Sequence, residues 1–100
     1  MTKSRDYSKA IGIVWLRQED FEAARAIFED ADKMPKTWAE WEEIATRAER
    51  QYQAEGRIPE RIYLDPGTFP DWCAREGVGV NSMARMRFAA MAVRRKYGVG

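Results

Sequence analysis

The sequence has no histidine and only one cysteine, Cys73, and these absences exclude several kinds of chemistry. Histidine is the commonest general base and the commonest ligand for transition metals, so we expect no metal, no cofactor and no catalytic residues. A lone cysteine cannot form a disulfide within the chain, which fits a reducing compartment. No base stands beside Cys73 to hold it as a thiolate. We therefore interpret it as a buried core residue.

Long hydrophobic runs and a large net charge are also missing. The longest apolar run, residues 10–16, is far too short to span a bilayer, and no cleavage site of small residues follows it. The net charge is +1 over 100 residues, of which 45% are hydrophobic. This composition predicts a soluble, cytoplasmic, globular protein with no membrane partner and a single domain, 1–100. We expect residues 1–8 to form a disordered N-terminal tail.

The charges are unevenly distributed along the chain. Residues 18–60 carry twelve acidic and six basic side chains, whereas residues 77–100 carry five basic side chains and no acidic one. A basic segment of this kind is compatible with nucleic-acid binding, although the overall charge does not indicate it.

Two segments predict strands, and a helix follows the first of them. Residues 10–16, "AIGIVWL", are apolar and partly β-branched, which is typical of a buried strand. Residues 19–31 place their apolar side chains on one face of a helix, which must end before Pro35. Residues 61–65, "RIYLD", alternate and predict a second strand, and the "DPG" turn follows.

Capping signals predict the other three helices. Thr37 and Glu40 form a capping box at the start of a helix that ends at Gly56. Thr68 is expected to cap a short helix that ends before Gly77. Asn81 or Ser82 is expected to cap the last helix, which runs to about residue 97. The helix after Thr37 carries an apolar stripe that we interpret as helix core: Trp38, Trp41, Ala45, Ala48 and Tyr52.

The predicted order is β-α-α-β-α-α, an α+β fold that is mostly helical, with a small two-stranded sheet in a single domain. Two strands alone make a marginally stable sheet. Either the helices cover this sheet or a second chain extends it.

The last helix has apolar side chains in two arcs, separated by basic residues. An ordinary surface helix has one apolar face, so either this helix is sandwiched inside the fold or one of its arcs meets another chain. We predict a homodimer in which Phe88 and Met91 form the interface.

The second half of the chain, "RIYLD…AREGVGVNSMARMRFAA", resembles the ribbon-helix-helix DNA-binding proteins, in which a strand from each of two chains reads the major groove. The resemblance implies that Arg61 and Tyr63 point outward from the ribbon. It also implies that Asn81 and Ser82 hold a phosphate at the start of the last helix. The positive charges of Arg85 and Arg87 would then add contacts to nucleic acid.

A wider resemblance covers most of the chain. The segments "GIVWLRQEDF", "FEDADKMPKTWAEW", "RIYLDPGTFPDWCAREG" and "ARMRFAAMA" are similar to a family of small uncharacterised bacterial proteins, which implies an α+β domain and no known activity. Our first hypothesis is a non-catalytic, self-associating interaction or structural domain. A ribbon-helix-helix-like DNA-binding regulator is the first alternative. The second is a protein that binds a small anionic ligand at the loop "GVGVNS", residues 77–82, beside Arg85.

Overall fold

The computed structural model describes residues 7–98, so most of the expected N-terminal tail lies outside the described residues. Tyr7–Lys9 form a single 3-10 turn. The helices and strands follow the predicted order β-α-α-β-α-α, which confirms the α+β fold class. They are β1 (Ala10–Trp15), α1 (Phe21–Ile27), α2 (Trp38–Ala54), β2 (Ile58–Tyr63), α3 (Phe69–Glu76) and α4 (Ser82–Tyr97).

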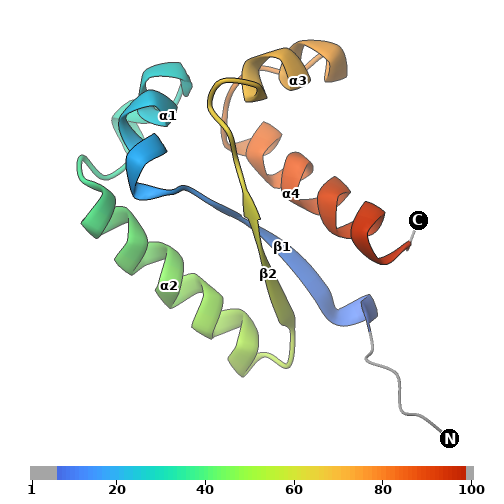
Figure 1. The fold of residues 1–100 in the computed structure, drawn as a ribbon. Helices are drawn as coiled ribbons and strands as arrows, with labels where there is room; N and C mark the ends of the chain where they lie inside the picture. The colour runs from blue at the N-terminus through green and yellow to red at the C-terminus, as the bar shows by residue number, and fades with distance from the viewer. Residues whose placement is uncertain (1–6, 99–100) are drawn as a thin grey trace, which may run out of the picture.

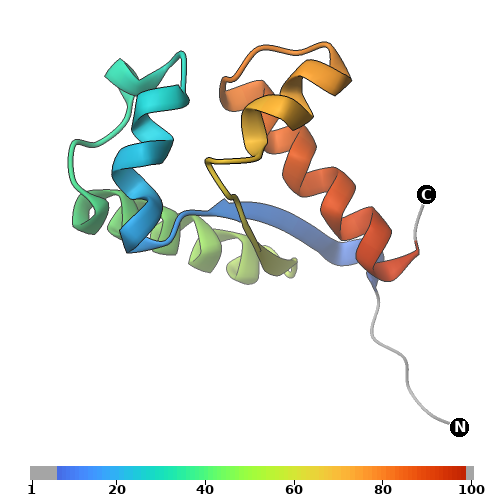
Figure 2. The same ribbon diagram turned by 45° about the horizontal axis from the view of Figure 1, so that its top comes forward.

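β1 and β2 pair in parallel, with Gly12 opposite Glu60 and Trp15 opposite Tyr63. α2 lies on one face of this sheet and α4 on the other (Figure 1). α1 and α3 lie beyond the carboxyl ends of the strands (Figure 2). The result is a narrow sheet between two long helices, and within residues 7–98 the outer edge of each strand has no neighbouring strand.

The ladder determines which backbone groups face those outer edges. The Leu64 N–H donates to the Trp15 carbonyl at 3.2 Å, so the polar backbone groups of Trp15 point toward β2. In a parallel ladder the direction alternates from residue to residue. The N–H and C=O groups of Gly12 and Val14 therefore point away from β2, toward the open edge of β1.

β2 begins at Ile58 rather than at the predicted Arg61, and it ends at Tyr63. The predicted bounds were wrong because the alternation at residues 61–65 overlaps only the second half of the strand. Because backbone groups alternate along the ladder, the nitrogen of Pro59 faces the outer edge of β2, where no hydrogen-bond donor is needed. On the face toward α4, the Glu60 carboxylate accepts from Lys96 Nζ at 2.8 Å and from the Tyr97 hydroxyl at 2.6 Å.

α1 is shorter than the predicted helix of residues 19–31. Phe28 has an extended backbone, and the helix ends at Ile27. The Glu29 N–H donates instead to the Val80 carbonyl at 2.8 Å. A contact with a distant segment thus ends the helix, although the local pattern would continue it.

Two of the three predicted caps are confirmed. The Thr37 side chain accepts from the Glu40 N–H, and the Asn81 side chain accepts from the Ala84 N–H at 3.1 Å. Thr68 stands at the start of α3 but makes no side-chain cap, because its hydroxyl is directed at the Asp65 carbonyl of the preceding turn.

The hydrophobic core lies at the carboxyl ends of the strands, between α1, α3 and the first half of α4. Phe69 is at its centre, with ring centroids 6.1 Å from Phe28 and 5.4 Å from Phe88. The amino-terminal half of the sheet is far less covered, since residues 10–14 are all only partly buried.

α4 lies directly against β1 at Gly12. A methyl group added to Gly12 would stand 2.4 Å from the Ala89 carbonyl oxygen and 2.9 Å from a Val93 methyl. The side chains of Ala89 and Val93 are buried by this contact. Only a residue without a side chain allows the helix to come so close to the strand.

We predict that Gly12→Ala lowers the free energy of unfolding by about 1–3 kcal/mol, because the methyl group meets rigid backbone and must displace α4. Chemical denaturation followed by circular dichroism measures this change. Gly67→Ala is the matched control, since its added methyl meets only the side chain of Asp65, at 3.3 Å. Equal effects of the two substitutions would contradict the close packing at Gly12.

Candidate functional site

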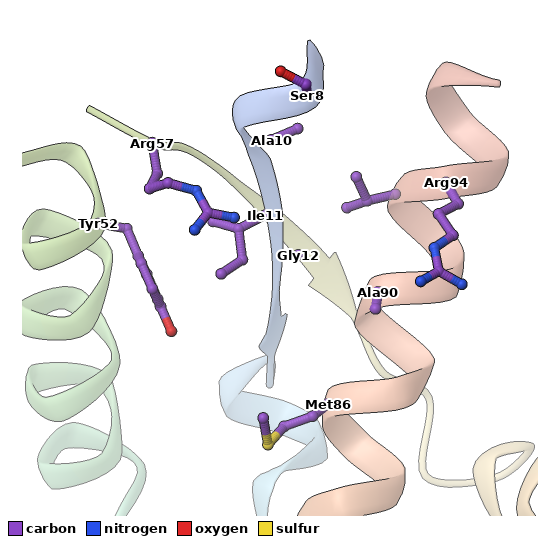
Figure 3. Close-up of a pocket in the computed structure, with 10 residues that line it drawn as sticks. Ser8, Ala10, Ile11, Gly12, Tyr52, Arg57, Met86, Ala90 and Arg94 are labelled. Atoms are coloured by element: carbon purple, nitrogen blue, oxygen red, sulfur yellow. The ribbon is translucent and has the colours of Figure 1, made fainter. Parts of the chain in front are cut away.

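A groove follows the open edge of β1 between α2 and α4 (Figure 3). It consists of two adjoining hollows of about 480 and 270 Å³ that share Gly12, Tyr52 and Met86. We call it the β1 groove, and its lining comes from β1 and the facing sides of both helices. Its apolar lining comprises Ala10, Ile11, Gly12, Ile13, Val14, Ala48, Met86, Ala89, Ala90 and Val93.

The backbone of β1 offers unused hydrogen-bonding groups to this groove. Among the described residues, the outward-pointing groups of Gly12 and Val14 have no hydrogen-bond partner. Both residues are only partly buried. An exposed strand edge of this kind is a template for pairing with another extended chain.

Polar side chains gather at the end of the groove near Ala10. Tyr52 extends from α2 into the space between α2 and β1, and the Arg57 guanidinium points inward beside Ile11 (Figure 3). Arg94 stands on the opposite side of the strand, on α4. The Arg57 Nε donates to the Lys9 carbonyl at 3.3 Å, which orients the side chain and leaves its terminal nitrogens available.

Arg61 lies away from this groove, on the side of the sheet that faces α2. Its guanidinium donates to both carboxylate oxygens of Glu49, at 2.8 and 2.9 Å, and lies 3.7 Å from the Trp15 ring centroid. These hydrogen bonds lower the pKa of Glu49 and raise that of Arg61. Tyr63 is 45% exposed, but its ring carries the Arg17 guanidinium at 4.2 Å. Arg61 and Tyr63 therefore belong to contacts within the chain.

The two arginines expected to contact nucleic acid also have carboxylate partners. Arg85 donates to both oxygens of Asp30, at 2.9 and 2.8 Å, and its guanidinium lies over the Phe28 ring. Arg87 donates to Glu76 at 3.0 Å. A phosphate would have to displace these partners before either arginine contributed to its binding.

The loop "GVGVNS", the predicted anion site, is approached by one of the chain's own carboxylates. The Val80 N–H donates to Glu29 Oε2 at 3.1 Å, and a methyl group on Gly79 would stand 2.9 Å from the same carboxylate. Asn81 caps α4, and Ser82 is the exposed first residue of that helix. Glu29 thus takes the position in which we expected a ligand.

The two apolar arcs of α4 have different surroundings. Phe88, predicted as dimer interface, packs inside the chain with its ring centroid 5.2 Å from that of Trp72. Met91 is partly buried. Met83 and Met86 are instead 78% and 72% exposed. Within the chain the short α3, whose position the sequence pattern does not reveal, packs against the arc that carries Phe88.

Cys73 is buried as predicted, with 1% of its surface exposed. Burial, with a smaller contribution from the negative charge of Glu29, raises the pKa of its thiol. Within residues 7–98 no three Cys, Asp or Glu side chains are grouped to hold a metal ion, and no helix has the length and apolar character to cross a membrane.

The residues around the β1 groove were largely missed by sequence reasoning. Tyr52 and Ala48 belong to the apolar stripe of α2 that we assigned to the core, yet Ala48 is exposed and Tyr52 half-buried. Arg57 and Arg94 carried no distinguishing pattern. The one available signal was a glycine in the middle of an apolar strand, which indicates close approach of another segment.

We predict that Asp30→Asn lowers the free energy of unfolding by about 1–3 kcal/mol at pH 7, because it breaks a charged pair of hydrogen bonds. Hydrogen bonds from Arg85 hold the pKa of Asp30 below its usual value. A lowered pKa in the folded state stabilises the fold above the pKa of the unfolded carboxyl group, about 4. The difference in the free energy of unfolding between wild type and Asp30→Asn should therefore be at its full size at pH 7 and should shrink as the pH falls below about 4.

Urea denaturation at several pH values measures this difference. Asp32→Asn is the control, since Asp32 is exposed and has no ion pair among the described residues. An Asp30→Asn effect that is the same at pH 7 and pH 3 would contradict the role of the carboxylate charge.

Comparisons with protein families, with curated proteins and with solved structures find no match for this chain.

Proposed function

We propose that this protein is a non-catalytic interaction domain that binds an extended segment of a partner protein along the open edge of β1. The observation that supports the proposal is that the outward-facing backbone N–H and C=O groups of Gly12 and Val14 have no partner among the described residues and lie in an apolar groove. Addition of a strand supplies main-chain hydrogen bonds to such an edge, and pockets on either side select alternate side chains.

The groove is suited to this mode of binding on both of its sides. A strand added beside β1 would direct alternate side chains toward α2 and toward α4. Ala48 and Tyr52 line the first side, and Met86 and Ala90 line the second. The opposite edge of the sheet is less suitable, because the outward-facing nitrogen of Pro59 has no hydrogen to donate.

A single extended segment suits this edge better than a second copy of β1. Adjacent strands lie about 4.8 Å apart, whereas packed helices need about 8–10 Å between their axes. α4 lies directly over β1 at Gly12. If two copies paired their β1 strands in antiparallel fashion, both α4 helices would lie on the same face and would collide.

Selection of random heptapeptides against the full chain tests the proposal. The peptides are displayed in two libraries, one with free and one with fused carboxyl termini. Selected peptides should protect the Gly12 and Val14 amides from hydrogen exchange, because those amides gain hydrogen bonds. Ala48→Gln should weaken binding about tenfold or more by placing a larger side chain in the groove. Ala54→Gln on the same helix is the matched control, since Ala54 is exposed and outside the groove. Failure to select peptides, or peptides that leave both amides unprotected, would refute the proposal.

Self-association is a second candidate, supported by the exposed side chains of Met83 and of Met86, which also lines the β1 groove. This apolar pair provides a patch that a two-fold contact between copies would bury.

We expect Met83→Glu to give a folded monomer, because the charge remains in water in the free chain. Phe88→Glu should instead unfold the protein, because it buries a charge among Phe69 and Trp72. Light scattering and circular dichroism separate the two outcomes. A wild-type mass of 11.6 kDa at high micromolar concentration would rule out self-association.

A further inference from the structure

We infer that the segment bound in the β1 groove is the carboxyl-terminal end of a partner protein, and that Arg57 and Arg94 bind its terminal carboxylate. The inference rests on the proposed function and adds the chemistry and the direction of the bound segment.

The charge at one end of the groove supports this inference. Arg57 and Arg94 both line the larger hollow, and both are exposed. Within the part of the chain that the structure describes, neither guanidinium has a carboxylate within ion-pair distance, whereas Arg61, Arg85 and Arg87 all do. No acidic side chain is among the described residues that line the groove. Two unpaired cations on opposite sides of one apolar hollow favour an anionic group between them.

The position of these arginines determines the direction of the bound segment. Arg57 donates to the carbonyl of Lys9, directly before β1, and Arg94 lines the same hollow from α4, across the strand. A segment antiparallel to β1 ends beside Ala10 and places its carboxylate there. A parallel segment would start there, and its positively charged amino terminus would be repelled by both arginines.

The rest of the hollow suits the residues just before a carboxyl terminus. Its apolar lining near Ala10 includes Ile11 and Ala90, which match small or medium apolar side chains. The Tyr52 hydroxyl has no hydrogen-bond partner among the described residues and points along the groove away from Ala10. It is available as a donor to the backbone of the bound segment.

The experiment uses peptides selected against the full chain and resynthesised in two forms, with a free carboxylate and with a carboxyl-terminal amide. We expect selection to enrich the free-carboxylate library, and the acid form to bind at least about tenfold more tightly than the amide form. Arg57→Gln and Arg94→Gln should each remove most of that difference, because each weakens binding of the acid form much more than binding of the amide form. Arg95→Gln is the matched control, because Arg95 is exposed on α4 and does not line the groove.

The possible results separate this inference from the function on which it rests. Equal affinity of acid and amide, with Gly12 and Val14 amides protected in both cases, would overturn the carboxylate inference and leave strand addition intact. Protection of neither amide by any selected peptide would overturn both. Decanoate serves as a probe without a peptide backbone. If it occupied the groove and no peptide did, the site would be one for acyl carboxylates, and both proposals would fail.

Discussion

The close contact between α4 and β1 at Gly12 is the constraint on which the rest of the structure depends. The Ala89 carbonyl oxygen occupies the space that any side chain at position 12 would need. Because α4 comes so close, Ala89 and Val93 are buried against a sheet of only two strands. The same contact centres the helix over the edge strand, so that α4 forms one side of the β1 groove. Packing of the helix and shape of the groove therefore have a common origin.

The arginines of this chain divide into two groups by their surroundings. Arg61 and Arg85 each make two hydrogen bonds to one carboxylate and lie over an aromatic ring, which is a geometry that guanidinium groups favour. Each joins segments that are distant in sequence, so these arginines help to hold the fold together. Arg57 and Arg94 have no such partner among the described residues, and they lie where the backbone of β1 is also unpaired. Unpaired charge and unpaired backbone therefore line the same groove.

The ion pairs also change how the basic carboxyl-terminal segment is interpreted. Residues 77–100 contain no acidic side chain, yet Arg85, Arg87 and Lys96 meet carboxylates from three earlier segments of the chain. A segment that looks basic in sequence is therefore largely neutralised in space. Because Arg85 and Arg87 are already paired with carboxylates, we do not assign them a role in binding nucleic acid.

Local signals in the sequence were enough to determine the order of the elements, most of their ends and the burial of Cys73. Capping side chains, apolar periodicity and glycine stops act within a few residues, and such information is fully present in the chain. Where a contact with a distant segment determines the end of an element or the burial of a side chain, the sequence pattern was not enough to predict it. Val80 ends α1, the outer edge tolerates Pro59 in β2, and α3 covers Phe88. The parallel pairing, the open edge at Gly12 and Val14 and the placement of Arg57 and Arg94 around one hollow arise only in the tertiary structure. Each involves residues whose separation along the chain carries no periodic signal.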